Sequence, residues 1–209
     1  MIFRFLRQWQ NKRALKSKEY IKLFEPYFGD ELVVLDTETT GLNPKKDEII
    51  SIGAVIIRDD KIRISNSFEC FLKPSGNINH ESIKIHHIRE CDLVNAVEPE
   101  EAIKQLLDFI GNRPIVGYYI SFDHKIISRY TKKIIGSRLP NPTVELSSMY
   151  YKRYRKSSSY EFVDLKFDTI MNGLGLPFLG KHDALNDAIM SAMIYLKLKS
   201  MPEYKGAFS

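Results

Sequence analysis

Two kinds of hydrophobic pattern alternate along this chain. Three runs rich in apolar and β-branched residues cover Leu32–Asp36, Glu48–Ile57 and Lys61–Leu72, and their length and composition are typical of β-strands. The second and third runs are joined by the polar sequence RDDK, which has the composition of a tight turn. We therefore expect these two strands to form an antiparallel hairpin.

The remaining patterns predict mainly helices with short strands between them. Helices are expected over residues 5–28, 99–112, 121–135, 164–172 and 183–198, and short strands over 114–119 and 144–146. Pro99 and Gly111 stand where helices commonly begin and end. Strands that alternate with helices indicate the α/β class, with helices on the faces of a mixed sheet. We expect a helical arm at residues 1–29 and one domain at 30–209.

The composition agrees with a single globular domain. The chain has 209 residues, of which 44% are hydrophobic and 27% are charged, so it can bury a sizeable core. Cys70 and Cys91 are far apart in the sequence, which favours a reduced cytosolic protein over a disulfide framework or a zinc site. Arg4 and Arg7 interrupt the first apolar stretch too early for a signal peptide, and no apolar run is long enough to span a membrane. We expect a soluble, cytoplasmic protein.

The positive charge is unevenly distributed. Residues 1–28 contain seven Lys/Arg and two Glu, which accounts for the whole net charge of +5. A second excess runs from Lys125 to Lys156, where nine Lys/Arg face only Glu145, and it ends in the sequence YYKRYRKSSSY. Basic residues interleaved with aromatic ones often hold single-stranded nucleic acid. A solvated surface with a serine-rich loop explains this pattern equally well.

The sequence VVLDTETTGL places two acids at the end of the first predicted strand. Side chains two residues apart on a strand point to the same face, so Asp36 and Glu38 converge. Two carboxylates this close repel each other and raise each other's pKa, and a divalent cation such as Mg²⁺ or Mn²⁺ removes the conflict. The alternative is that Asp36 caps a turn while Glu38 is solvated.

Two further acids lie at the starts of predicted helices. GYYISFDH puts Asp123 in a first helical turn, with Ser121 as the expected N-cap, and GKHDALNDA puts Asp187 on the last helix. If Asp183 caps that helix, His182 lies in the preceding loop and can reach toward Asp187, where it can take a proton near neutral pH. Asp123 could instead serve only the helix dipole, and His182 could be an ordinary loop residue.

Three segments of the chain resemble, in their order and spacing, the three motifs of the DEDDh (DnaQ-like) 3′–5′ exonuclease family. They are VVLDTETTGL with EIISIGAVII, then IVGYYISFD, then HDALNDA. The resemblance covers about residues 30–200. It implies a ribonuclease H-like fold with a mixed five-stranded sheet flanked by helices, here with an extra N-terminal helix. It also implies four metal-binding acids, which are Asp36, Glu38, Asp123 and Asp187, with His182 as the general base.

The resemblance also implies a mechanism. Two divalent cations about 4 Å apart straddle the scissile phosphate in two-metal hydrolysis. By analogy, Asp36 bridges the ions, Glu38 and Asp187 hold the ion that activates water, and Asp123 supports the second ion. His182 takes the proton of the attacking water. The product is a nucleoside 5′-monophosphate released from a 3′ end.

A nucleotide pocket is implied near these acids. IKIHHIRE resembles the apolar-His-Gly-Ile segment of the family, although His87 stands at the glycine position. The candidates to contact the terminal nucleotide are Thr39, Thr40, Leu42, Ile85, His86, Tyr119 and Phe122. Leu42 and Phe122 could instead be plain core residues. Tyr118 and Tyr119 replace the His-Asn pair that many members carry, which leaves nucleotide selectivity and rate less well specified than the metal site.

The sequence also leads to expectations about partners and function, each with alternatives. About ten residues follow Leu198, fewer than the polymerase-binding tail of the family's proofreading subunits, so we expect a stand-alone nuclease. Three roles are open for the basic N-terminal helix. It packs on its own domain, it contacts DNA phosphates, or it binds another protein. The favoured function is exonuclease action on single-stranded DNA ends. The alternatives are an RNA-trimming exonuclease and a catalytically weak nucleic-acid-binding adaptor, to which the tyrosine pair points.

Overall fold

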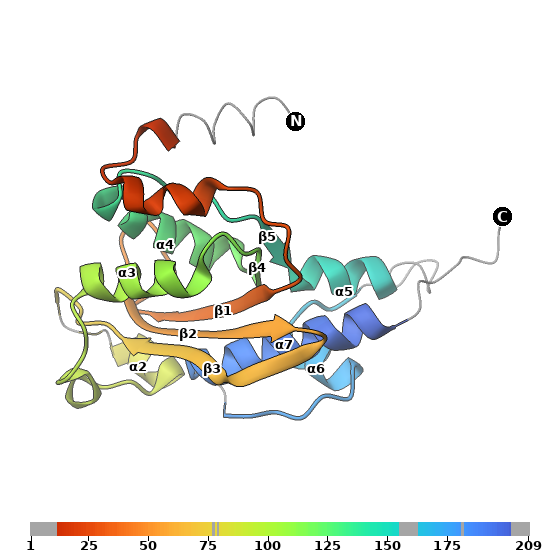
Figure 1. Cartoon of the computed structure of the whole chain (residues 1–209). Coiled ribbons are helices and arrows are strands. Elements are labelled where there is room, and N and C mark those ends of the chain that lie inside the picture. The colour runs from red at the N-terminus through yellow and green to blue at the C-terminus, as the bar shows by residue number, and fades with distance from the viewer. Residues whose placement is uncertain (1–11, 77, 79, 155–162, 181, 202–209) are drawn as a thin grey trace.

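A single mixed sheet forms the centre of the molecule. The computed structural model describes residues 12–76, 78, 80–154, 163–180 and 182–201. The five strands are β1 (Leu32–Thr39), β2 (Ile49–Arg58), β3 (Lys61–Phe71), β4 (Ile115–Gly117) and β5 (Thr143–Glu145), in the order β3-β2-β1-β4-β5 (Figure 1). Strands β1, β4 and β5 are parallel, whereas β2 is antiparallel to both of its neighbours. The predicted α/β class and mixed sheet are confirmed.

The predicted hairpin is formed by β2 and β3. Its turn residues Asp59 and Asp60 have φ values of 51° and 54°. A two-residue hairpin turn with positive φ at both central positions matches the right-handed twist of the strands, and Asp tolerates this conformation better than most residues. The RDDK sequence therefore sets the register of the two longest strands.

Helices cover both faces of the sheet. Helices α3 (Pro99–Ile110) and α4 (Ser121–Ile134) lie on one face, and α5 (Leu146–Tyr154), α6 (Phe167–Gly173) and α7 (Ala184–Ser200) lie on the other (Figure 1). The short helix α2 (His80–His86) and two 3₁₀ segments, η1 (Lys18–Phe24) and η2 (Glu90–Leu93), complete the described elements. None of the described helices is long and apolar enough to cross a membrane.

Alternate residues of β1 pack against the two helical layers. Val33 and Leu35 join the core under α3 and α4, whereas Val34 joins the core under α7. All three are buried because both faces of this central strand are covered. The period-2 alternation places Asp36 and Glu38 on the same side as Val34, facing α7.

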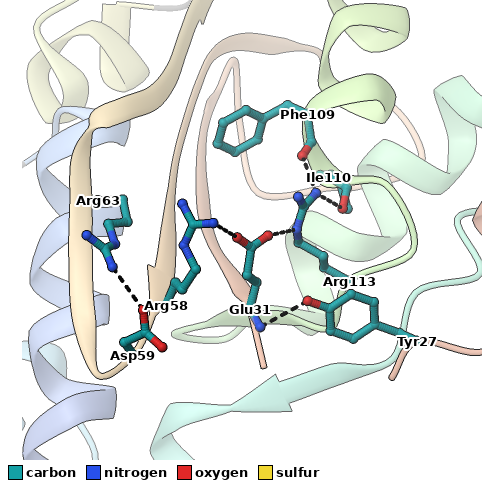
Figure 2. Close-up of polar contacts among 8 residues, drawn as sticks. All are labelled: Tyr27, Glu31, Arg58, Asp59, Arg63, Phe109, Ile110 and Arg113. Carbon is teal, nitrogen blue, oxygen red and sulfur yellow. Dashed lines mark hydrogen bonds and ion pairs between the residues drawn. The ribbon is translucent and has the colours of Figure 1, made fainter. Parts of the chain in front are cut away.

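The amino end of β1 is fixed by an ion-pair network. Glu31 contacts Arg58 at 3.1 Å and Arg113 at 2.6 Å, and its backbone N–H donates to the Tyr27 hydroxyl at 2.9 Å (Figure 2). Arg113 also donates to the carbonyl oxygens at the end of α3. A half-buried carboxylate that pairs with two guanidinium groups contributes more to stability than an isolated ion pair on the surface. This network ties β1 to the end of β2 and to the loop after α3, at the end of β1 opposite Asp36 and Glu38.

The continuous helix predicted over residues 5–28 is wrong in its described part. Residues 14–17 are not helical, and Ser17 accepts from the backbone N–H of Glu19 to cap the separate 3₁₀ segment η1. Leu23 is buried in the core that includes α3, so this segment packs on its own domain. Gly136 allows this packing, because a Cβ there would lie 2.2 Å from the Ala14 carbonyl oxygen. Residues 5–11 lie outside the described part.

Other differences concern element ends. The strand predicted over 144–146 is β5 and ends at Glu145, and α5, which the sequence pattern did not indicate, begins at the next residue. Helix α6 begins at Phe167 instead of residue 164. Ser121 is not the N-cap of α4, because Ile120 takes that position and makes no side-chain capping bond.

Candidate active site

Four acids approach one another at the carboxyl ends of the parallel strands β1 and β4. Asp36 and Glu38 stand on β1 itself, and Asp123 lies in the first turn of α4, which follows β4. Asp187 lies in the first turn of α7. The carboxyl edge of parallel strands is where open α/β sheets commonly bind ligands. Three separate elements therefore bring charged groups to one place.

A glycine on the neighbouring strand lets α7 reach this place. Asp36 pairs with Gly53 across β1 and β2. A Cβ at Gly53 would lie 2.2 Å from both the carbonyl carbon of Ala184 and the backbone nitrogen of Leu185. Only a residue without a side chain allows the first turn of α7 to lie directly on β2 beside Asp36. This contact positions Asp187.

The start of α7 also positions the predicted histidine. Asp183 is the N-cap and accepts from the backbone N–H of Asn186 at 2.8 Å, so His182 lies in the preceding loop, as its spacing predicted. The backbone N–H of His182 donates to Asp187 Oδ2 at 3.1 Å. One ligand atom from each of Glu38, His182 and Asp187 lies within 4.8 Å of the others.

The fourth acid is held from the other face of the sheet. Asp123 is 4% exposed, and its Oδ1 accepts from the hydroxyl of Thr37 at 2.6 Å. Thr37 stands between Asp36 and Glu38 on β1 and points the opposite way. One strand therefore orients Asp123 on the α4 side while it presents two acids on the α7 side.

Burial and mutual repulsion raise the pKa values of these acids. Burial raises the pKa of Asp36 well above its ordinary value, and the charges of the other three acids raise it further. Burial raises the pKa of Glu38 to about 8, with Asp187 as the main electrostatic contributor. Burial raises the pKa of Asp123 to about 7, although the hydrogen bond from Thr37 opposes this.

The site has the properties of a cation-binding site. Within the described residues, no Lys or Arg forms an ion pair with Asp36, Glu38 or Asp123. Buried carboxylates without a compensating charge favour a bound cation, which removes the repulsion. Carboxylate oxygens suit Mg²⁺ or Mn²⁺. The residues present therefore fit divalent cations.

Glu145 is an additional acid at the site that the sequence patterns did not single out. It ends β5, and its Oε1 accepts from the backbone N–H of Tyr119 at 2.9 Å and from the hydroxyl of Ser147 at 2.9 Å. Its charge also raises the pKa of Asp123. Its place at the end of the third parallel strand was the signal available in the sequence, but the short strand was predicted one residue too late.

The loops before α4 and α7 share a backbone feature. Tyr119 and His182 have φ values of 49° and 60°, and each precedes its acid-bearing helix by two residues. Positive φ is uncommon for residues with side chains and often occurs at functional sites. The hydroxyl of Tyr118 donates to the Leu165 carbonyl at 2.8 Å, while Tyr119 is 54% exposed. Tyr118 is thus an anchor, and Tyr119 is the more exposed member of the pair.

The predicted nucleotide-binding residues differ in their environments. Leu42 is 87% exposed, so it is not a core residue, and Ile85 is 51% exposed. Phe122 is half-buried. The hydroxyls of Thr39 and Thr40 bond within the loop that joins β1 to β2, to Gly41 O at 2.7 Å and to the Glu48 N–H at 3.0 Å. These two threonines shape the loop.

His86 and His87 have distinct positions at the end of α2. His87 has a φ of 58°, and its N–H donates to the Ile83 carbonyl, which is the usual conformation of a glycine after a helix. His86 is buried, and its Nδ1 accepts from the N–H of Ile88 at 3.0 Å, so Nε2 carries the proton of the neutral ring. Burial lowers the pKa of His86, and His87 and His182 lower it further.

The comparisons with known proteins agree with this fold. The model of the RNase_T exonuclease family matches residues 33–195, so the chain belongs to this exonuclease family, and the predicted DnaQ-like membership is confirmed. PolC-type DNA polymerase III of Thermotoga petrophila is 35% identical over 188 residues, which is 90% of this chain but 13% of that protein. DNA polymerase III subunit epsilon of Aquifex aeolicus is 29% identical over 185 residues, 87% of each chain.

Solved structures share the fold at lower identity. Cell-death related nuclease 4 aligns with a TM-score of 0.71 and 20% identity over 82% of this chain and 64% of that chain. Exonuclease I of E. coli, in complex with a dT13 oligonucleotide, aligns with a TM-score of 0.68 and 15% identity over 81% of this chain and 41% of that chain. The mixed sheet flanked by helices is the ribonuclease H-like fold of these nucleases.

Proposed function

We propose that this chain is a metal-dependent 3′–5′ exonuclease that releases nucleoside 5′-monophosphates from single-stranded DNA. The observation that carries the proposal is the convergence of Asp36, Glu38, Asp123 and Asp187 with His182 at the carboxyl ends of β1 and β4. Membership of an exonuclease family supports this chemistry. The raised pKa values of the acids support a role in binding cations.

The four acids would hold two divalent cations, Mg²⁺ or Mn²⁺. When bound, the cations would neutralise the acids, polarise the scissile phosphodiester and stabilise the charge that develops on it. Thr37 would keep Asp123 oriented through its hydroxyl. Gly53 would keep Asp187 beside Asp36 by letting α7 approach.

His182 would act as the general base in this proposal. Its imidazole lies on the exposed side of the site, with a ligand atom within 4.8 Å of those of Glu38 and Asp187. It would accept a proton from a water molecule whose oxygen attacks the terminal phosphorus. The bond from phosphorus to the 3′-oxygen of the preceding nucleotide breaks, and that oxygen takes up a proton. The products are a 5′-monophosphate and a strand with a new 3′-hydroxyl.

The terminal nucleotide would bind among exposed apolar groups near the acids. Leu42, Ile85 and Tyr119 are exposed and offer apolar surface to a base. His86 Nε2 is buried and has no hydrogen-bond partner among the described residues, so its N–H is available to a sugar or phosphate oxygen. Phe122, Thr39 and Thr40 complete the predicted pocket as supports.

Single-stranded DNA is the favoured substrate, since exonuclease I of E. coli has been described with bound dT13 and dA16 oligonucleotides. RNA trimming is the alternative within the same chemistry. The adaptor alternative rests on Tyr118 and Tyr119, but the Tyr118 hydroxyl is bonded to the Leu165 carbonyl and all five catalytic candidates are present in the chain. The described part of the N-terminal segment packs on the domain, and a docking role for this segment stays a prediction.

A gel assay with 5′-labelled single strands of DNA and RNA tests this function. With Mg²⁺ or Mn²⁺ we expect a descending ladder that EDTA abolishes and that His182→Ala reduces by about a hundredfold or more. The strand that is degraded faster identifies the substrate. Strands that are bound but never shortened would contradict the exonuclease and favour the adaptor.

A further inference from the structure

An open basic groove runs along the outer face of α4. It has a volume of about 1100 Å³ and lies between α4 and residues 138–143, with Pro44 and Lys45 also on its wall. Six Lys or Arg side chains line this groove and no Asp or Glu does, namely Lys45, Lys125, Arg129, Lys132, Lys133 and Arg138. Such a wall concentrates positive potential in a hollow of the surface.

The α4 side of the groove is one continuous helical stripe. Ser121, His124, Lys125, Ser128, Arg129 and Lys132 recur at spacings of three and four residues. Ile126 and Ile127 point to the core instead. The stripe from Ser121 to Lys132 extends about 16 Å along the helix axis. That length is roughly five times the 3.4 Å spacing of charges along one strand of a duplex.

Most of these cations are not neutralised by the protein. Lys45, Lys125, Lys132, Lys133 and Arg138 form no ion pair within the described residues. All five are exposed. Clustered cations repel one another, so a surface that keeps them unpaired is suited to a polyanion.

The groove also offers a hydrogen-bonding group. Ser128 is a 6% exposed residue of the groove wall, and its hydroxyl oxygen is buried beneath that wall with no hydrogen-bond partner among the described residues. Buried polar atoms normally have partners, so an unpartnered hydroxyl indicates a missing one. Hydroxyls of Ser and Thr are common donors to the phosphate oxygens of nucleic acids.

One end of the groove lies at the start of α4, the helix whose first turn carries Asp123. Ser121 lines the groove, and Asp123 lies two residues further on in the same helical turn. A strand whose 3′ end occupies the site therefore has a basic path beside it. We propose that this groove binds the sugar-phosphate backbone of the substrate strand, several nucleotides away from the 3′ end. The proposal rests on the proposed exonuclease function.

A nucleic acid fits the groove better than an acidic protein segment. Its charges repeat regularly along a single line, as the cations do along α4. The basic stretch seen in the sequence from Lys125 onward is divided by the fold. Lys125, Arg129, Lys132, Lys133 and Arg138 enter the groove, whereas Arg153 lies on α5 and donates to the Leu198 carbonyl.

The test removes three groove charges and compares long with short substrates. The groove variant is Lys125→Gln with Lys132→Gln and Arg138→Gln. The matched control removes three charges elsewhere, with Lys61→Gln, Lys73→Gln and Lys104→Gln. Binding of labelled dT20 and rU20 is measured in EDTA by fluorescence anisotropy across a range of salt concentrations. Hydrolysis of the p-nitrophenyl ester of thymidine 5′-monophosphate is measured with Mn²⁺, because this substrate is too short to reach the groove.

We expect the groove variant to bind dT20 at least tenfold more weakly than the wild type and the control. The slope of log affinity against log salt should become shallower by about 2, since each lost phosphate contact contributes about 0.7 for a single strand. Hydrolysis of the ester should change less than twofold. The relative losses for dT20 and rU20 show which backbone the groove holds.

Two results of the binding comparison, and one of a competition experiment, would overturn the groove proposal. One is unchanged dT20 and rU20 affinity and salt slope in the groove variant, and the other is an equal loss in the control. Competition by poly-glutamate as strong as that by dT20 at equal charge would assign the groove to acidic proteins. If the wild type fails to hydrolyse the ester, the exonuclease proposal fails, and the binding comparison still decides the groove independently. Thermal melts show whether each variant is folded.

Discussion

On the proposed mechanism, the carboxylate of Asp36 serves chemistry at the expense of stability. It is partly buried and repelled by three neighbouring acids, and both effects raise its pKa. We expect Asp36→Asn to reduce hydrolysis roughly a thousandfold, because on the proposed mechanism the metal site would supply several kcal/mol of charge stabilisation. In EDTA the same variant should be more stable than the wild type by about 1–2 kcal/mol, or roughly 2–8 °C in Tm.

Activity assays and thermal melts on the purified variant measure both effects. Asp108→Asn on α3 is the matched control, because Asp108 is an exposed acid away from the site. It should leave activity and Tm unchanged. An Asp36→Asn enzyme with wild-type activity would exclude Asp36 from the mechanism.

His87 occupies a backbone conformation that suits glycine, with a φ of 58° after α2. A left-handed conformation costs a residue with a side chain about 1–2 kcal/mol, and the greater freedom of glycine in the unfolded chain offsets part of this. We expect His87→Gly to stabilise the fold by about 0.5–1 kcal/mol, measured by urea unfolding. His87→Ala keeps the Cβ and should give no gain, so equal effects of the two substitutions would contradict this explanation.

The individual acids of the site could be predicted from the sequence because each stands in a short motif at the end of an element. The position of His182 followed from the capping role of Asp183. Glu145 could not be recognised in the same way. Its contact with the Tyr119 backbone joins residues far apart in the chain, and no local pattern encodes this contact.

At the scale of elements, the approach of α7 to β2 depends on one glycine. A Cβ at Gly53 would overlap backbone atoms of Ala184 and Leu185, which have no freedom to rotate away. We expect Gly53→Ala to shift the start of α7, to destabilise the fold by about 1–3 kcal/mol and to reduce kcat by about a hundredfold. Chemical denaturation and steady-state kinetics measure these effects.

Gly76→Ala is the control for this substitution. A Cβ at Gly76 would have no atom within 4 Å, so the control should retain activity. If Gly53→Ala retained full kcat as well, α7 would not need to lie this close to β2.

The long elements followed from the sequence, and the short ones did not. Strands β1 to β3 are long runs of apolar and β-branched residues, and helices α3, α4 and α7 have apolar residues at helical spacing, so the type of each could be predicted. Helix α5 has Leu146 and Tyr150 as its buried hydrophobic residues among tyrosines and cations, so its pattern was weak. A single helix was predicted for the N-terminal segment because neither Gly nor Pro marks the break at Ser17, where the cap of η1 interrupts the helical pattern.

The basic groove could not be predicted from local sequence patterns. Its walls come from the loop after β1, from α4 and from residues 138–143, and only the folded chain places them together. The sequence indicated a basic stretch beginning at Lys125, but it did not show which of its cations share a surface.

At the scale of the whole molecule, the repelling acids make stability depend on pH and on cations. The folded pKa values of Glu38 and Asp123 are about 8 and about 7, whereas in the unfolded chain both are near 4. Between about pH 4 and the folded pKa values, these two carboxyl groups keep their protons in the folded state and release them in the unfolded state. The contribution of these two groups to the free energy of unfolding is therefore largest near pH 4, and it falls as pH rises toward 8.

We expect the metal-free protein to lose on the order of 3 kcal/mol between pH 5 and pH 8, or roughly 6–12 °C in Tm. Added Mn²⁺ should restore most of this loss at pH 8 and little of it at pH 5. Thermal melts in EDTA and in Mn²⁺ across this range measure the effect, and Glu38→Gln should flatten the EDTA curve. A metal-free Tm that rises with pH would show that the acids are not under this repulsion.

The placement of Asp187 on α7 has a consequence for how the protein is made. During translation the segments that carry Asp36, Glu38 and Asp123 leave the ribosome before residues 184–200 do. On the proposed mechanism, a nascent chain that lacks α7 holds three of the four acids and cannot cleave nucleic acid. Docking of α7 on Gly53 completes the site. On the same mechanism, the order of synthesis would delay nuclease activity until residues 184–200 have emerged and packed on β2.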